Sequence, residues 1–185
     1  EGAFSSIYDF AESASIKNVV IESGVTGIGD NAFYDCTELS SITIADSVTS
    51  IGNSAFKSCS SLVSVVIPNG VTSISDGTFN GCSSLESVTI PDGVTTIGTS
   101  AFYDCSSLIE VTIPNKTKSI GTSAFSYCSA LTSVSIPQSV TSIGDWAFYN
   151  CSMLTEITVE ENNAYYSSDG SGVLFNKNKT DLIQY

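Results

Sequence analysis

The six cysteines are the residues of this sequence with the widest chemistry, because a thiolate can act as a nucleophile, ligate a metal or enter a disulfide. They recur every 23 residues, at Cys36, Cys59, Cys82, Cys105, Cys128 and Cys151. The chain contains no histidine, which excludes a Cys–His nucleophile, a Ser-His-Asp triad and a histidine-ligated zinc. Glycoside hydrolysis by two carboxylates would need them roughly 5–9.5 Å apart in a cleft. The 19 acidic residues are scattered over the repeat instead, so we expect a protein that is not an enzyme, without catalytic residues.

The even spacing of the cysteines indicates a structural role. Cysteines that form a disulfide framework join different parts of a fold, whereas these occupy one phase of a repeat. Neighbouring cysteines in such a column lie within disulfide range by their Cα distance, but their Cβ vectors run parallel. A straight column also cannot supply tetrahedral metal coordination. We interpret the cysteines as buried, reduced core residues, with no metal and no cofactor; disulfides and a metal or redox role are the alternatives.

The repeat that carries the cysteines also carries a column of phenylalanines, at Phe33, Phe56, Phe79, Phe102, Phe125 and Phe148. Six copies follow one another without an insertion or deletion. A weaker copy precedes them, with Phe10 in the phenylalanine position and Ser13 in the cysteine position. Repeats of this length are typical of solenoids, so we predict a continuous array over residues 1–159 with about seven coils, the first one degenerate.

One coil shows which elements must position these columns. Residues 85–90 alternate apolar and polar side chains, as a short strand does. The Pro-Asp-Gly sequence at 91–93 is a turn signal, and a second extended segment follows at 94–97. Gly98 indicates a close backbone approach, and the rest of the coil is predicted to form a short helical turn, α or 3₁₀, opened by an N-cap such as Asp76 in the preceding copy. Stacked coils would pair their strands in parallel at about 4.8 Å and align identical side chains.

The composition limits the partners of such an array. Its apolar share of 42% is sufficient for a core, while six lysines and no arginine face the acidic residues and give a net charge of −13. This charge repels phosphate backbones and anionic lipid headgroups, so we expect no nucleic acid and no membrane surface as partner. No apolar run approaches the roughly 20 residues that a bilayer span requires, so we expect no membrane insertion.

The full pattern, L-x-x-V-x-I-P-x-x-V-T-x-I-G-x-x-A-F-x-x-C-x-x, resembles the BspA-like leucine-rich repeat family over about residues 16–159. Members of that family are mostly surface proteins of anaerobic bacteria and of some parasitic protists. The resemblance implies a leucine-rich-repeat solenoid, a right-handed superhelix with a parallel β-sheet on its concave face and short extended or 3₁₀ segments on its convex side. It further implies an extracellular or cell-surface location and a protein ligand on a host or neighbouring cell. It assigns no catalytic residue.

The tail, residues 160–185, is predicted to be a terminal turn and a β-hairpin. The sequence from Tyr165 onward resembles the hairpin that commonly follows these repeats, and the chain stops where the family often continues. Because the chain also begins at Glu1, we expect a mature or excised piece of a longer protein. Ends that expose apolar coil edges make end-to-end self-association plausible. Thr117 stands where other copies have valine, and there we expect a looser convex edge.

Binding residues are expected where the outward strand positions depart from small hydroxyl side chains. Val63, Val66 and Ile109 are apolar at such positions and are flanked by Glu86 and Glu110, as in an interaction surface. This pattern favours a non-enzymatic adhesion module that binds protein through its concave face. The alternative is a structural spacer or stalk without binding of its own.

Trp146 is the only tryptophan of the chain. Its repeat position otherwise holds Asn, Ser or Gly, a range that an inward position would hardly accept, so we predict that it lies on the convex surface. It is a candidate anchor of an interface, and packing on neighbouring side chains is the alternative.

Overall fold

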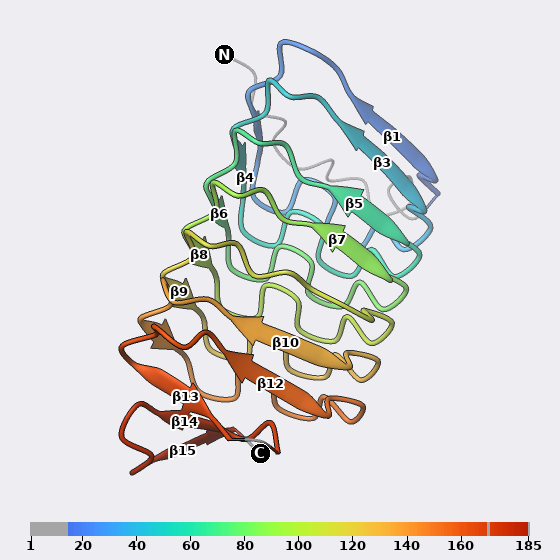
Figure 1. The fold of residues 1–185 in the computed structure, drawn as a ribbon. Coiled ribbons are helices and arrows are strands. Elements are labelled where there is room, and N and C mark those ends of the chain that lie inside the picture. The colour runs from blue at the N-terminus through green and yellow to red at the C-terminus, as the bar shows by residue number, and fades with distance from the viewer. Residues whose placement is uncertain (1–14, 170, 185) are drawn as a thin grey trace.

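The computed structural model describes residues 15–169 and 171–184. The chain forms a β-solenoid of about 6 turns of roughly 23 residues, stacked as a rod (Figure 1). The predicted leucine-rich-repeat solenoid with a parallel sheet is confirmed. The positions of Phe10 and Ser13 in the weak first copy lie outside the described residues. Within the described part of the chain no helix is present, and so none is long and apolar enough to cross a membrane.

One side of the rod carries the longer strands and is called here the long-strand face; it is the face predicted to be concave. Its strands are β1 (Asn18–Ile21), β3 (Ser41–Ile44), β5 (Ser64–Val66), β7 (Ser87–Thr89), β10 (Ser133–Ile136) and β12 (Glu156–Val159). They pair in parallel as β1–β3, β5–β7 and β10–β12, with each residue opposite the one 23 positions later. Residues such as Val65 point into the core and their neighbours point outward. The pairing therefore aligns equivalent positions of successive repeats.

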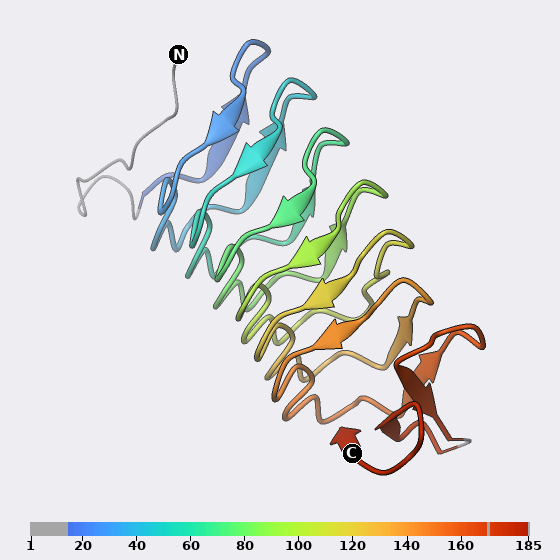
Figure 2. The ribbon, with the colours of Figure 1, turned by 90° about the vertical axis from the view of Figure 1, so that its left-hand side faces the viewer.

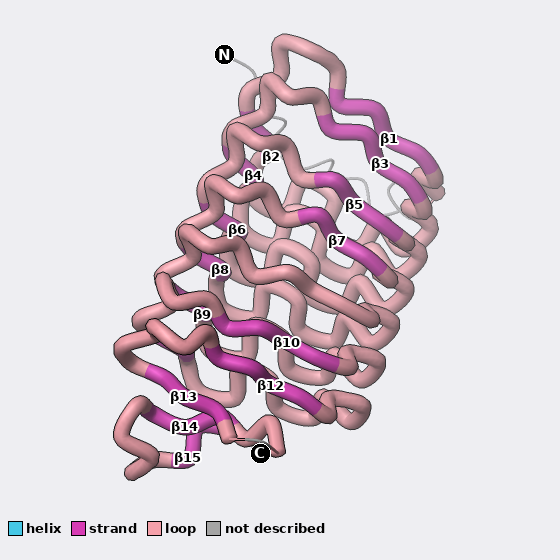
Figure 3. Tube along the Cα trace, in the orientation of Figure 1, coloured by secondary structure: helices cyan, strands magenta, loops and turns pink. Residues whose placement is uncertain are grey.

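A second side carries two-residue strands, visible behind the long-strand face in Figure 3. These are β2 (Gly27–Ile28), β4 (Ser50–Ile51), β6 (Ser73–Ile74), β8 (Thr96–Ile97), β9 (Ser119–Ile120) and β11 (Ser142–Ile143). Each buries or partly buries its isoleucine. A glycine follows each of these strands except β6, which is followed by Ser75, and it lies against the backbone of the preceding coil: a Cβ on Gly121 would lie 2.5 Å from the carbonyl carbon of Gly98. Close approach, not a positive φ, is therefore what favours glycine here.

The third side is a turn, and the prediction of a helical turn there is wrong. Two residues of each turn have left-handed backbone; the first of them is Asn31, Ser54, Gly77, Ser100, Ser123 or Trp146. The turn's backbone N–H groups also donate to the next coil, as Phe79 N–H does to the carbonyl of Ala101 at 2.8 Å. Asp76 likewise caps no helix, because its carboxylate accepts from the N–H of Thr99, in the next coil, at 2.7 Å. Bonds between coils alternate with turn bonds inside the coil, such as that from the N–H of Asn80 to the carbonyl of Gly77 at 3.0 Å, so the N–H groups are satisfied without a helix.

The core is a set of columns that run along the rod. The phenylalanine rings stack from Phe33 to Phe148, with centroids 5.2–5.6 Å apart and nearly parallel planes. All six rings are buried, and the leucine column beside them is buried from Leu39 to Leu131. Thr117 does not loosen the structure as expected, since it is fully buried and donates its hydroxyl to the carbonyl of Val94 at 3.1 Å.

The tail forms one strand more than a hairpin. An antiparallel sheet contains β13 (Tyr166–Ser168), β14 (Leu174–Asn176) and β15 (Leu182–Gln184). It lies across the last coil at the end of the rod (Figure 2), where β13 and β14 contact β12 and Leu174 is buried in the core. The expectation of an exposed apolar edge for end-to-end association is therefore wrong for this end.

Candidate binding surfaces

The cysteine column is a row of buried hydrogen-bond donors. The structure contains six free cysteines, all buried. Each thiol from Cys59 onward donates to the carbonyl of the phenylalanine 26 residues earlier, as Cys82 does to Phe56 at 3.1 Å. Burial, partly offset by a backbone hydrogen bond, raises the pKa of Cys82 to about 12 and that of Cys151 to about 11. The thiols stay protonated at neutral pH and thus lack the thiolate that nucleophilic or metal chemistry requires.

Raising the pH from 8 to 11 is expected to lower the free energy of unfolding because of these thiols. The pKa of these thiols is higher in the folded chain than in the unfolded chain, so the unfolded chain loses its thiol protons first as the pH rises. The stability that the protonated thiols contribute is complete below about pH 9 and is lost as the pH rises toward 11–12. Urea midpoints measured across this range would show the fall. Cys82→Ser retains a donor that does not titrate, so its midpoint should fall less; an equal fall in both proteins would contradict the contribution of Cys82.

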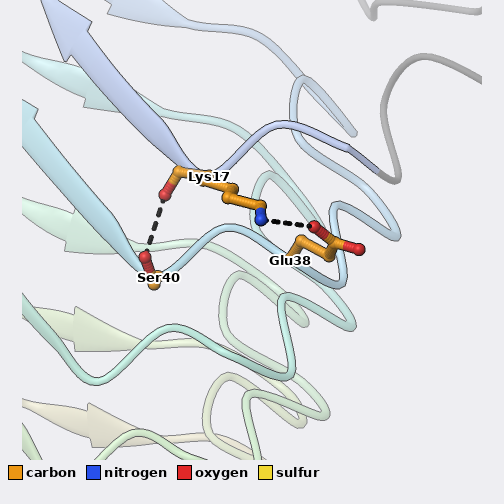
Figure 4. A network of polar contacts seen from close by, with 3 residues as sticks. All are labelled: Lys17, Glu38 and Ser40. Atoms are coloured by element: carbon orange, nitrogen blue, oxygen red, sulfur yellow. Dashed lines mark hydrogen bonds and ion pairs between the residues drawn. The ribbon is translucent and has the colours of Figure 1, made fainter.

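The polar contacts of the described residues mostly tie one coil to the next. Figure 4 shows Lys17 with its ammonium 3.5 Å from the carboxylate of Glu38 and its carbonyl accepting from the hydroxyl of Ser40 at 3.1 Å. Both charged side chains are well exposed, so this pair contributes little to stability. Across residues 15–169 and 171–184, no three His, Cys, Asp or Glu side chains are grouped so that they could hold a metal ion.

The predicted apolar residues of the long-strand face are exposed, but they do not form one continuous patch. Val66 is 68% exposed and Ile109 is 52% exposed, while Val63 is also on the surface. Val63 and Ile109 occupy the same strand position two coils apart, and the exposed Glu86 lies between them in the intervening coil. Glu86 therefore separates the apolar residues instead of bordering them, whereas Glu110 adjoins Ile109 in the chain.

The long-strand face is interrupted on either side of β5 and β7. The neighbouring strands β3 and β5 contact one another but do not pair. Beyond β7, the segment 109–113 forms no strand, and no backbone hydrogen bond joins its residues 110–113 to β7 or β10. A hollow of about 350 Å³ lies between β7 and this segment, and another of about 330 Å³ lies between the segment and β10; Glu110 and Thr112 line both. Val66 thus lies on an unpaired strand edge, and Ile109 directly precedes the unpaired segment that borders the two hollows.

Trp146 is on the turn side of the rod, 66% exposed, away from the other candidate residues. It lines a depression of about 390 Å³ together with Tyr103, Tyr127 and Tyr149. Reasoning on the sequence found Trp146 and missed the tyrosines. Their spacings of 24 and 22 residues, close to one repeat, are the signal that could have indicated a shared surface.

Comparison with known protein families gives a match over residues 6–129 and 74–172, in 6 copies, to the family described as BspA type leucine rich repeat region. Comparison with curated proteins gives no match. Among solved structures, a leucine-rich repeat protein from Eubacterium ventriosum is 32% identical, with a TM-score of 0.61. That match covers 95% of this chain and 40% of the other.

Two further structures are similar to this chain. A leucine rich cell surface protein from Faecalibacterium prausnitzii is 34% identical, with a TM-score of 0.59, and the match covers 92% of this chain and 46% of that one. The pneumococcal vaccine antigen PcpA is 23% identical, with a TM-score of 0.59, and shares the fold over 91% of this chain and 36% of its own. The chain spans less than half the length of each of these proteins.

Proposed function

The chain belongs to the BspA-type leucine-rich repeat family, and on this premise we propose that it is a non-enzymatic adhesion module that binds a protein through its long-strand face. The ligand is a surface protein of a host or neighbouring cell. An extracellular or cell-surface location is supported by the relative from Faecalibacterium prausnitzii, which is described as a cell surface protein. The net charge of −13 opposes nucleic acid as the partner.

The observation that carries this proposal is the coincidence of exposed apolar side chains with gaps in the backbone pairing. Val66 lies on the edge of β5 that β3 leaves unpaired, and Ile109 directly precedes the unpaired segment 110–113 beyond β7. Exposed apolar residues contribute most to binding where a partner can desolvate them, and unpaired strand edges accept the main chain of a partner. Glu86 and Glu110 supply charge that selects among partners.

The alternative function is a spacer that holds another domain away from the cell. One observation favours it: most outward positions of the long-strand face carry small hydroxyl side chains, and four of these bond to the equivalent residue one coil earlier, as Thr155 does to the carbonyl of Thr132. Such a face is satisfied within the chain and needs no partner.

Replacing Val63 and Val66 with glutamate is expected to abolish retention of the partner, because two carboxylates would have to be desolvated in the interface. The immobilised chain is incubated with solubilised surface proteins of candidate host and neighbouring cells, and the retained proteins are identified by mass spectrometry. Proteins retained by the wild type and lost from Val63→Glu/Val66→Glu support adhesion.

A matched control is Val20→Glu, since Val20 occupies the strand position of Val66 two coils earlier and is 67% exposed. This variant is expected to retain the same proteins as the wild type. If Val63→Glu/Val66→Glu retained the same proteins as the wild type, this result would contradict the adhesion proposal and favour the spacer.

A further inference from the structure

A second surface of the molecule, on the turn side, contains several aromatic rings that do not belong to the core columns. Tyr103 and Tyr149 occupy the same turn position two coils apart, and the coil between them has Ser126 there. The next residue, Tyr127, fills the gap with its ring: its centroid lies 5.2 Å from that of Tyr103 and 5.7 Å from that of Tyr149. With Trp146, these rings form what is called here the aromatic turn site.

The backbone holds Trp146 in a conformation that a bulky residue rarely adopts. Its φ is 58°, in the left-handed region, where the equivalent residues are Asn, Ser or Gly. The buried hydroxyl of Ser126 donates to the Trp146 carbonyl at 2.5 Å, and the N–H of Tyr149 donates to the same carbonyl at 3.0 Å. A strained position that displays an exposed indole is costly for the fold, and such positions gather at binding sites.

The rings are inclined to one another, so they surround the site from several directions instead of forming one flat surface. Tyr103 and Tyr127 are inclined by 54°, and Tyr127 meets Tyr149 edge-on at 76°. A row of coplanar rings would suit a chain of sugar rings, whereas inclined rings present several π-faces to one compact group. Cations are attracted to such faces within about 6 Å of the centroid.

The charges around the site favour a cation as well. Asp104 follows Tyr103 in the chain and Asp145 precedes Trp146, and both carboxylates are on exposed residues. No basic residue lines the depression, and the chain as a whole carries −13. The same turn position in earlier coils shows the interaction within the chain, because the ammonium of Lys57 lies 5.6 Å from the ring centroid of Tyr34.

We propose that the aromatic turn site binds an arginine side chain presented by a basic segment of a partner protein. A planar, weakly hydrated guanidinium stacks on aromatic faces more readily than an ammonium, and Trp146 offers the largest exposed face. The depression of about 390 Å³ is open, so the partner's main chain can lie across it while one side chain enters. This site uses none of the residues of the long-strand face, and the two proposals stand or fall separately.

The test uses the fluorescence of Trp146, which reports on this site alone because no other tryptophan is present. The chain is titrated at low salt with an acetylated, amidated peptide of alternating arginine and glycine, and with the same peptide carrying citrulline in place of arginine. The arginine peptide is expected to change the emission saturably. The citrulline peptide, which keeps the shape and loses the charge, should bind at least tenfold more weakly.

Substitutions by residues found at the same turn position keep the fold intact. Tyr149→Asn introduces the residue of the equivalent Asn80 and is expected to weaken the arginine peptide at least tenfold; Tyr34→Asn, the same change at the other end of the column, should leave the affinity unchanged. Trp146→Ser, matching Ser123, should abolish the heat of binding in calorimetry. Equal binding of the two peptides, an unaltered affinity in Tyr149→Asn, or saturable binding of maltoheptaose with no response to the arginine peptide would each overturn the proposal.

Discussion

Replacing Phe79 with alanine is expected to lower the free energy of unfolding by about 3–5 kcal/mol. The ring is completely buried between Phe56 and Phe102, whose centroids lie 5.5 and 5.3 Å away. The variant loses the transfer free energy of the ring, leaves a cavity and removes two stacking contacts from the middle of the column. Urea unfolding followed by circular dichroism measures the loss.

The matched control for this variant is Tyr149→Ala, which removes an aromatic ring that is 50% exposed and belongs to no core column. We expect it to cost less than about 1 kcal/mol. A loss of under about 1 kcal/mol for Phe79→Ala as well would show that the phenylalanine column does not dominate the core.

Asn163→Ala is expected to destabilise the protein by a similar amount, although the side chain it removes is small and polar. Asn163 is fully buried, and its side chain makes four hydrogen bonds. Its amide nitrogen donates to the carbonyls of Pro137 and Val140, and its oxygen accepts from the N–H groups of Tyr165 and Tyr166, at 2.8–3.0 Å. Each partner left unsatisfied costs about 1–3 kcal/mol, so we expect a total loss of about 3–5 kcal/mol where water reaches some of them.

This residue joins the last coil to the terminal sheet, so its loss should release β13 to β15 first. Amide hydrogen exchange of this sheet, measured by NMR, is expected to speed up well before the central coils are affected. Asn162→Ala is the control, because the adjacent asparagine is exposed. Equal protection of the sheet in the two variants would mean that Asn163 is not the residue that fastens it.

The regular spacing of the repeated residues was sufficient to predict the columns of the core, but it was not sufficient to predict the path of the backbone between these columns. A constant interval of 23 residues places Phe79 beside Phe102 whatever the backbone does in the turn. The turn itself is ambiguous, because Asp, Ser and Asn favour both an N-cap and a left-handed residue. The choice between a helical N-cap and a left-handed turn depends on the neighbouring coils, because these offer carbonyl acceptors to N–H groups of the turn.

The candidate binding surfaces were predictable only in part, for a related reason. Outward apolar residues such as Val66 and Ile109 follow from strand alternation. The unpaired segment 110–113 does not, because its alternating sequence matches that of the paired strands. Tyr127 and Tyr103 occupy different positions of the repeat, and their rings come together only because the ring of Tyr127 extends toward the column of Tyr103. A comparison of equivalent repeat positions overlooks such a contact.

The coil that contains Ile109 is hydrogen-bonded to both neighbours through its turn and its short strand, but it forms no paired strand on the long-strand face. Its short strand β9 pairs with both β8 and β11, while its segment 110–113 pairs with nothing on the long-strand face. A rod whose coils are bonded on two sides and lack bonds on the third bends most easily where the third side is unpaired. Pulling on the two ends of the rod would therefore concentrate bending at this coil, and the curvature of the molecule and the width of the gap beside segment 110–113 would change together.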